Sequence, residues 1–161
     1  MCLLFIHGGG FAVGHPLQNL WSLCHLRRLL QRRLAKGTEV DIFSLDYDLS
    51  TSSKYPTQIV QANAAYEYLM SSFHPHNIVL MGDSAGGNAI LSLCHAIAAR
   101  AQRVPDKQLR RSALPAGALL LSPWLDLRCS AKSFRRNGHK DILSPRAARF
   151  WADCYVGNRA L

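Results

Sequence analysis

The alternation of short apolar runs with longer segments of helical periodicity is the feature that most constrains the fold. Runs of strand length occupy residues 2–6, 39–47, 77–81 and 116–122. Segments with apolar residues at helical spacing occupy residues 16–37, 57–72 and 85–103. Strands separated by helices form parallel β-α-β units with right-handed crossovers. The sequence therefore predicts an α/β fold on a doubly wound, mostly parallel sheet of about four strands.

Two further segments carry no strand signal. The polar stretch 104–115 is predicted to be a loop. After residue 123, only the stretch that follows the Ser-Pro pair at 144–145 has the pattern of a short helix. We interpret the chain as one domain over 1–161, with a sheet core over 1–123 and an extension across the sheet over 124–161.

Composition and cysteine usage limit the class of protein. The 161 residues are 48% hydrophobic and 18% charged, as in an ordinary globular chain. No apolar run approaches the eighteen or so residues of a membrane span, and no basic leader precedes the first run. The five cysteines are scattered without a C-x-x-C pair, which argues against a zinc site or disulfides. We therefore expect a cytoplasmic protein without a metal or cofactor.

The net charge of +9 comes largely from two basic clusters, at residues 27–36 and 100–111. A nucleic-acid surface would interleave such a cluster with aromatic residues or form a known module, and neither cluster does so. We interpret them as a solvated helix face and a basic loop, and expect no nucleic-acid partner.

The pentapeptide GDSAG, residues 82–86, places a serine between an apolar run and a helical segment. It matches the G-x-S-x-G turn, in which a sharp bend exposes the serine hydroxyl at the carboxyl edge of a sheet. The N-terminus of the following helix favours negative charge that develops there. Ser84 is therefore the candidate nucleophile, and Asp83 beside it is expected to point away and to be structural. A structural glycine turn is the alternative for the pentapeptide alone.

The tetrapeptide HGGG, residues 7–10, follows the first apolar run. Consecutive glycines let backbone N–H groups approach a ligand, as an oxyanion hole requires. A phosphate-binding loop would end in Lys-Ser or Lys-Thr, which this loop lacks. In a doubly wound sheet the loops after the first and third strands face each other where the strand order reverses. Both motifs lie on those two loops, which favours a nucleophile at Ser84.

Four segments in this order, FIHGGGFAVG, LDYDLSTSSKYPTQ, GDSAGGN and SPWLDL, resemble the hormone-sensitive-lipase-like branch of the α/β-hydrolases. That branch includes microbial carboxylesterases and arylacetamide-deacetylase-like enzymes. The resemblance implies a partial α/β-hydrolase fold and a serine ester hydrolase without a cofactor. It also implies that Ser84 attacks the ester carbonyl. The oxyanion would be held by N–H groups of Ala85 and of the glycines Gly8, Gly9 and Gly10, chiefly the last two.

The resemblance also implies parts that have no matching position in this sequence. The family carries strands before the HGGG strand and, after its cap, an acid and a histidine in the order Ser, Asp/Glu, His. We therefore expect the domain over 1–161 to be incomplete at both ends, with 124–161 forming part of the cap. The strands at 39–47 and 116–122 would then be exposed edges, which favour self-association.

No histidine in the sequence is an evident base for Ser84. His95 lies about three turns into the following helix, too far along its axis to reach the serine. His139 lies in the cap segment, and His7 is better suited to brace the glycine loop. Asp126 follows the fourth strand, where an acid could orient a histidine. A carboxylate that anchors its own loop is the favoured interpretation of Asp126.

Three interpretations of function remain open. The first is a serine carboxylic-ester hydrolase that acts on a small apolar ester through an acyl-enzyme on Ser84. Its turnover as this chain alone is expected to be weak or absent, since a missing base costs several orders of magnitude. The second is a non-catalytic protein whose binding of a small apolar ligand would be unaffected by Ser84→Ala. The third is assembly with another chain that supplies the missing strands and histidine.

Overall fold

Four strands form one parallel sheet in the order β2-β1-β3-β4. The structure is a computed structural model that describes residues 1–157. The strands are β1 (Cys2–Ile6), β2 (Asp41–Leu45), β3 (Ile78–Asp83) and β4 (Gly117–Leu121). β1 and β3 lie in the centre of the sheet, where both faces are covered, so their sequences are apolar along most of their length. The strand order confirms the predicted doubly wound arrangement.

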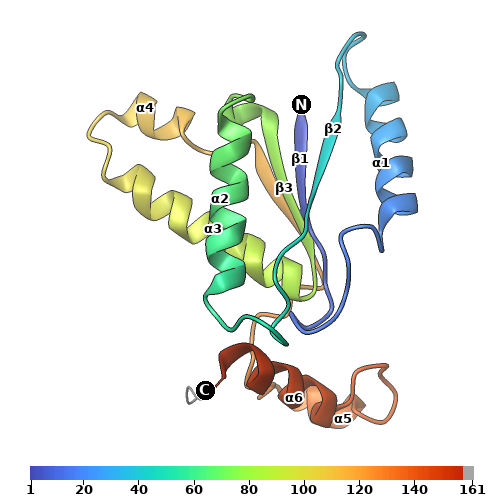
Figure 1. Ribbon diagram of the computed structural model, residues 1–161. Coiled ribbons are helices and arrows are strands. Elements are labelled where there is room, and N and C mark those ends of the chain that lie inside the picture. Colours follow the sequence, from blue (N-terminus) through green and yellow to red (C-terminus); the bar gives the residue numbers. More distant parts are fainter. Residues whose placement is uncertain (158–161) are drawn as a thin grey trace.

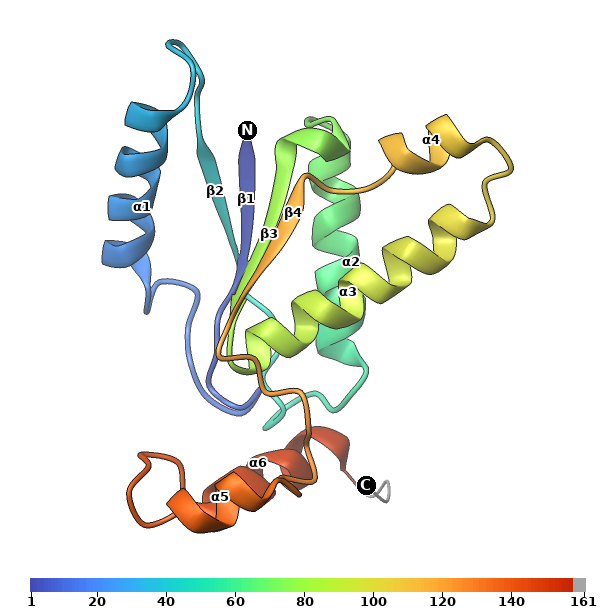
Figure 2. The ribbon, with the colours of Figure 1, turned by 180° about the vertical axis from the view of Figure 1, so that it is seen from behind.

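Helices cover both faces of this sheet (Figure 1 and Figure 2). The helices are α1 (Leu20–Arg33), α2 (Thr57–Met70), α3 (Ala85–Gln102), α4 (Lys107–Ser112), α5 (Lys132–Asn137) and α6 (Pro145–Val156), with a short 3₁₀ turn, η1 (Pro75–Asn77), before β3. α1 packs on one face of the sheet, whereas α2 and α3 pack on the other. The predicted alternation of strands and helices is therefore confirmed.

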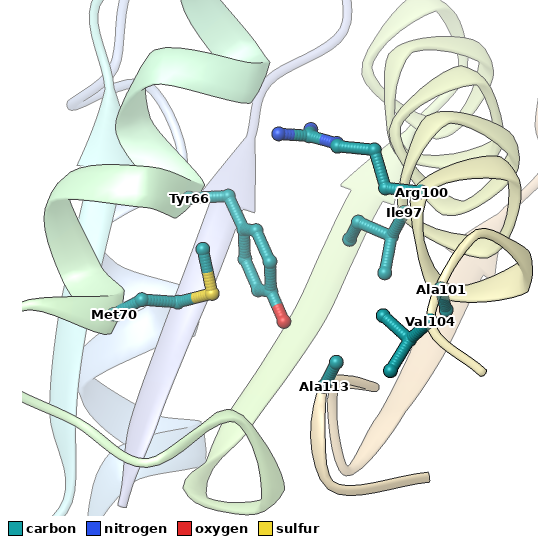
Figure 3. Close-up of a pocket in the computed structure, with 7 residues that line it drawn as sticks. All are labelled: Tyr66, Met70, Ile97, Arg100, Ala101, Val104 and Ala113. Carbon is teal, nitrogen blue, oxygen red and sulfur yellow. The ribbon is translucent and has the colours of Figure 1, made fainter. Parts of the chain in front are cut away.

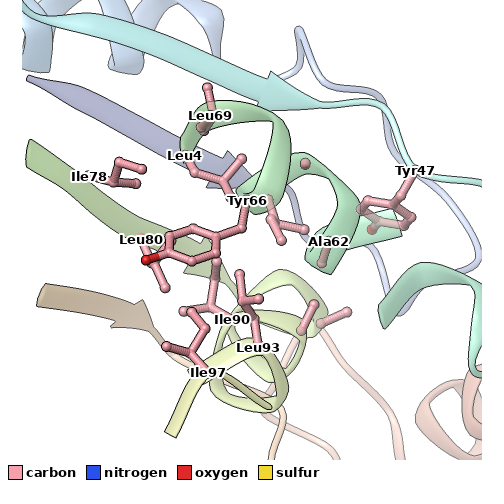
Figure 4. Packing of buried hydrophobic residues seen from close by; sticks show 14 of the residues in the cluster. Leu4, Tyr47, Ala62, Tyr66, Leu69, Ile78, Leu80, Ile90, Leu93 and Ile97 are labelled. Carbon is pink, nitrogen blue, oxygen red and sulfur yellow. The ribbon is translucent and has the colours of Figure 1, made fainter. Parts of the chain in front are cut away.

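The main core lies between the sheet and helices α2 and α3 (Figure 4). Leu4, Ile78 and Leu80 project from the strands, and Tyr66 and Ile90 meet them from the two helices. All five side chains are buried. Their alternate positions along each strand place them on one face, and this burial fixes the register of β1 against β3. The core therefore holds rigid the strand ends from which the glycine loop and the serine turn emerge.

On the other face of the sheet, α1 covers the central strands but leaves β4 open. Leu3, Phe5, Leu23 and Met81 form a smaller buried cluster between the sheet and α1. Leu119 is paired in register with Met81 and shares its side of the sheet, but its side chain is 47% exposed. Within residues 1–157, β2 pairs only with β1 and β4 only with β3. Both outer strands are therefore open edges in the described part of the chain, in the positions predicted from the sequence.

The prediction of a loop over residues 104–115 is wrong, because this stretch contains helix α4. Asp106 caps this helix by accepting the N–H groups of Gln108 and Leu109, each at 2.8 Å. The helix has six residues, too few for an apolar period to show in the sequence. In the last segment, the predicted helix after Ser144 is present as α6, and α5 precedes it without having been predicted.

Helices α5 and α6 lie beyond the carboxyl ends of the strands (Figure 1 and Figure 2). The Tyr155 ring of α6 stacks on Phe11 with 3.9 Å between the ring centroids. The Tyr155 carbonyl also accepts the N–H of Tyr55 at 2.8 Å. These contacts attach the segment after β4 to the sheet core. The last residues of the predicted cap segment, 158–161, lie outside the described residues. No helix within residues 1–157 has the length and apolar character needed to cross a membrane.

Candidate active site

Ser84 occupies a strained backbone position between β3 and α3. Its φ of 51° and ψ of −115° lie outside the regions that non-glycine residues favour. Hydrogen bonds hold this conformation from both sides of the turn. The Ser84 N–H donates to the Leu121 carbonyl at 2.9 Å, and the Ser84 carbonyl accepts the N–H of Trp124 at 2.9 Å. The turn therefore has the geometry that the G-x-S-x-G motif predicts.

The glycines that flank Ser84 are required by close backbone contacts. A Cβ atom on Gly82 would lie 2.4 Å from the carbonyl oxygen of Gly86. A Cβ atom on Gly86 would lie 2.0 Å from the carbonyl oxygen of Ile6, at the end of β1. Any side chain at these positions would push α3 away from the sheet. The small residues thus allow the serine turn to sit directly against the loop that follows β1.

The loop that follows β1 is joined to the serine turn through Asp83. The Asp83 carboxylate accepts the N–H of Gly8 at 2.8 Å. The side-chain amide of Asn19 also approaches the same oxygen, at 3.5 Å. The structural role expected for Asp83 is therefore to hold the glycine loop against the serine turn.

The backbone N–H groups of this loop differ in availability. The N–H of Gly8 is already donated to Asp83. Gly9 and Gly10, with φ of 114° and 60°, donate to no acceptor within the described part of the chain. Ala85 opens α3, and the first N–H groups of a helix have no intrahelical acceptor. Three of the four predicted oxyanion donors thus have N–H groups available for a ligand, and Gly8 does not.

His7 braces the glycine loop from inside the core. Its ring is fully buried and stacks on Tyr47 with 4.3 Å between the ring centroids. The His7 Nδ1 lies 2.7 Å from the Gly8 carbonyl, so this nitrogen carries the proton and donates. The Tyr47 hydroxyl donates to the His7 carbonyl at 2.9 Å. Burial lowers the pKa of His7 and raises that of Tyr47, which keeps both rings neutral.

The other candidate acid and base residues make no contact with the serine. His95 is exposed on α3, and His139 is exposed in the segment between α5 and α6. Hydrogen bonds from Ser130 and then from Arg128 hold the pKa of the Asp126 carboxyl well below its ordinary value. Asp126 therefore anchors its own turn. Within residues 1–157, the Ser84 hydroxyl makes no hydrogen bond. In the same part of the chain, no three His, Cys, Asp or Glu side chains gather to hold a metal ion.

A cavity of about 160 Å³ lies beside Ser84. The glycine loop, the serine turn, the segment after β4, helices α5 and α6 and the loop between them supply its walls: Gly10, Ser84, Ser122, Pro123, Trp124, Phe134, Leu143, Ala148 and Trp151. Most of these side chains are apolar, so the cavity suits an uncharged, apolar group. Trp124 belongs to the SPWLDL segment that carried the family resemblance. The contribution of residues from α5 and α6 to this cavity had no signal in the sequence.

A strained serine between a strand and a helix, beside a glycine loop that follows the neighbouring strand of a doubly wound sheet, is typical of an α/β-hydrolase site. A family profile described as alpha/beta hydrolase fold matches residues 3–161, and the chain belongs to that family. Its similarity is to the hormone-sensitive-lipase-like branch, as the sequence resemblance indicated. A solved structure of an esterase from the bacterial hormone-sensitive lipase family matches 99% of this chain and 48% of its own, with 29% identity and a TM-score of 0.78.

Two curated relatives show the extent of the similarity. An esterase of Acinetobacter venetianus is 32% identical over 142 residues, which are 88% of this chain and 41% of that protein. An arylacetamide deacetylase of Oryctolagus cuniculus is 28% identical over 167 residues, covering 99% of this chain and 39% of that protein. The chain thus spans about two fifths of the length of the curated relatives it matches.

Proposed function

We propose that this chain carries the nucleophile and the oxyanion hole of a serine ester hydrolase. The observation that supports this most is the position of Ser84, in a strained turn at the N-terminus of α3 and beside the free N–H groups of the glycine loop. A structural turn would need no available N–H groups and no adjoining cavity. The relatives named esterase and arylacetamide deacetylase support the same class of reaction.

In the proposed reaction, the Ser84 Oγ attacks the ester carbonyl carbon and loses its proton to a base. The carbonyl oxygen becomes an oxyanion, which accepts hydrogen bonds from the N–H groups of Gly9, Gly10 and Ala85. Collapse of this intermediate expels the alcohol, which takes up the proton, and leaves an acyl group on Ser84. Water then attacks the acyl-enzyme by the same route and releases the acid. We assign no oxyanion role to Gly8, because its N–H is donated to Asp83.

Among residues 1–157, no histidine makes a hydrogen bond with the Ser84 hydroxyl. His7 uses its protonated Nδ1 on the Gly8 carbonyl, while His95 and His139 are exposed without a contact to Ser84. We therefore propose that a histidine outside these residues completes the site, and that turnover by the 161-residue chain alone is weak. We retain the proposed division into a sheet core over 1–123 and a partial cap over 124–161 of one incomplete domain.

We propose a small apolar ester as the substrate. Trp124, Phe134 and Trp151 give the cavity an apolar wall, and its volume of about 160 Å³ limits the group that it encloses.

We further propose a cytoplasmic location, which the five free cysteines support. We also propose self-association through the open edges of β2 and β4. The basic residues of α1 are proposed to form a solvated face, without a nucleic-acid partner.

The test is hydrolysis of p-nitrophenyl butyrate by the purified chain, with and without added imidazole. Imidazole can act as an external base where the protein's own base is absent. Without imidazole, we expect the chain to hydrolyse the ester slowly. With imidazole, we expect the chain to exceed the rate of the same imidazole concentration in buffer by about tenfold or more. The matched control, Ser84→Ala, should show only the buffer rate.

Equal rates for the wild type and Ser84→Ala at every imidazole concentration would contradict an ester hydrolase. The non-catalytic alternative is tested by ligand binding instead of by hydrolysis. It requires saturable binding of the uncleaved ester with the same dissociation constant in the wild type and in Ser84→Ala. A rate as high as that of a complete esterase without imidazole would contradict the proposed absence of a base.

A further inference from the structure

A second cavity lies far from Ser84, between the carboxyl ends of α2 and α3 and the end of α4 (Figure 3). Its volume is about 200 Å³. The residues that line it are Tyr66, Met70, Ile97, Arg100, Ala101, Val104 and Ala113. Arg100 and Ala85 are separated by about 22 Å along the axis of α3. The cavity is therefore independent of the proposed active site.

Tyr66 places an unpartnered hydroxyl at this cavity. Its side chain is 1% exposed, and its hydroxyl oxygen is buried without a hydrogen-bond partner. Figure 3 shows this hydroxyl directed toward Val104 and Ala113, across the cavity from α2. Burial raises the pKa of Tyr66 to about 12, so the group stays protonated and can donate at neutral pH. A buried hydroxyl without a partner is costly, and a bound acceptor would remove that cost.

Arg100 does not make this cavity an anion site. Its guanidinium forms an ion pair with Glu67 and donates a second hydrogen bond to the side-chain carbonyl of Asn63. Its charge is therefore already compensated by a carboxylate. The remaining walls come from aliphatic side chains and one thioether, Met70. The chemistry of the cavity is that of an apolar space with one hydrogen-bond donor.

We propose that this cavity binds a small neutral molecule with an apolar body and one acceptor oxygen, such as a ketone. The body contacts Met70, Ile97 and Val104, and the oxygen accepts the hydrogen bond of the Tyr66 hydroxyl. Aliphatic cavities of about 150 Å³ hold a benzene molecule, so one of this size admits a single substituted ring. The Tyr66 hydroxyl distinguishes such a ligand from a hydrocarbon of the same shape.

The experiment uses two fluorinated probes of nearly equal shape, 4-fluoroacetophenone and 4-fluoro-α-methylstyrene. The first has a carbonyl oxygen where the second has a methylene group. Each is titrated with the chain, and the ¹⁹F resonance reports binding. We expect saturable binding of the ketone to the wild type, weakened by about fivefold in Tyr66→Phe, which removes one hydrogen bond. The same variant should leave the dissociation constant of the styrene unchanged.

Two further variants locate the binding. Ala113→Leu places a larger side chain in this cavity and should weaken both probes. Leu143→Phe fills the cavity beside Ser84 instead and should leave both dissociation constants as in the wild type. No saturable binding of the ketone, or equal ketone affinities in the wild type and Tyr66→Phe, would overturn the proposal. Loss of binding in Leu143→Phe with retention in Ala113→Leu would assign the probes to the other cavity and would also overturn it.

Discussion

The Asp83 carboxylate accepts the N–H of Gly8 at 2.8 Å. The two residues are 75 positions apart in the sequence, and each belongs to one of the two glycine-rich motifs. This hydrogen bond joins the loop after β1 to the turn that carries Ser84. The spacing between the glycine N–H groups and the serine therefore depends on a side chain that takes no part in the proposed chemistry.

Removal of the Asp83 carboxylate should slow the reaction of Ser84. In Asp83→Ala the glycine loop loses its hydrogen bond to the serine turn, so its free N–H groups are held less firmly beside the serine. Loss of one oxyanion donor costs about a hundredfold or more in rate, so we expect a drop of about tenfold or more in fluorophosphonate labelling. Asp83→Asn keeps an acceptor oxygen and should retain most of the rate. Equal rates in all three proteins would contradict this role for Asp83.

A side chain at Gly10 should destabilise the fold through both strain and collision. Gly10 has a φ of 60°, and a Cβ atom there would lie 2.7 Å from the Trp151 indole ring. We expect Gly10→Ala to lower the free energy of unfolding by about 3 kcal/mol, measured by urea titration. Gly37→Ala is the matched control, because Gly37 also has a positive φ, of 87°, but nothing lies within 4 Å of its Cβ position.

For Gly37→Ala we expect a loss of only about 1 kcal/mol, from backbone strain alone. A loss at Gly10 no larger than that at Gly37 would show that Trp151 does not pack on the glycine loop. Such a result would remove Trp151 of α6 from the wall of the cavity beside Ser84.

His7 should make the fold sensitive to acid. Burial lowers its pKa in the folded state below the ordinary value of 6.5, so the unfolded chain binds a proton first as the pH falls. The contribution of His7 to stability is fully present above about pH 6.5. It is lost progressively as the pH falls from there to the lower pKa of the folded state. His7→Asn keeps an N–H donor for the Gly8 carbonyl without this titration. Urea unfolding at pH 7.5 and 5.0 should show a larger loss in the wild type than in His7→Asn, and equal losses would exclude the contribution of His7.

A charge on the open face of β4 should reduce self-association. Leu119 belongs to the edge strand β4 and is 47% exposed, and lysine on an edge strand opposes edge-to-edge pairing. We expect Leu119→Lys to shift the chain toward the monomer in sedimentation velocity. Val60→Lys adds the same charge at a side chain of α2 that is 61% exposed, and it should sediment as the wild type does. A monomeric wild type, or equal shifts in both variants, would contradict association through β4.

The sequence predicted those parts of the fold that depend on local pattern. The apolar runs of β1 and β3 and the glycine spacing around Ser84 are local signals. The strand order was expected from the doubly wound topology of alternating strands and helices, and the structure confirms it. The position of Trp151 over Gly10 results from tertiary packing between distant residues, and no local pattern encodes it. The hydrogen bond from the Gly8 N–H depends on the orientation of the Asp83 side chain. The sequence predicted a structural role for Asp83, but it did not predict that Gly8 is its partner.

The central claim is that Ser84 is the nucleophile, and site-resolved labelling with a fluorophosphonate tests it most directly. The folded chain is incubated with the probe and then digested. Mass spectrometry identifies the modified peptides. We predict that one phosphonyl group per chain forms slowly, on the peptide that contains Ser84. No adduct should form when the chain is unfolded in urea before labelling, or in Ser84→Ala. Ser122 lines the same cavity and serves as the internal comparison. No adduct on Ser84, or equal labelling of Ser84 and Ser122, would contradict the assignment.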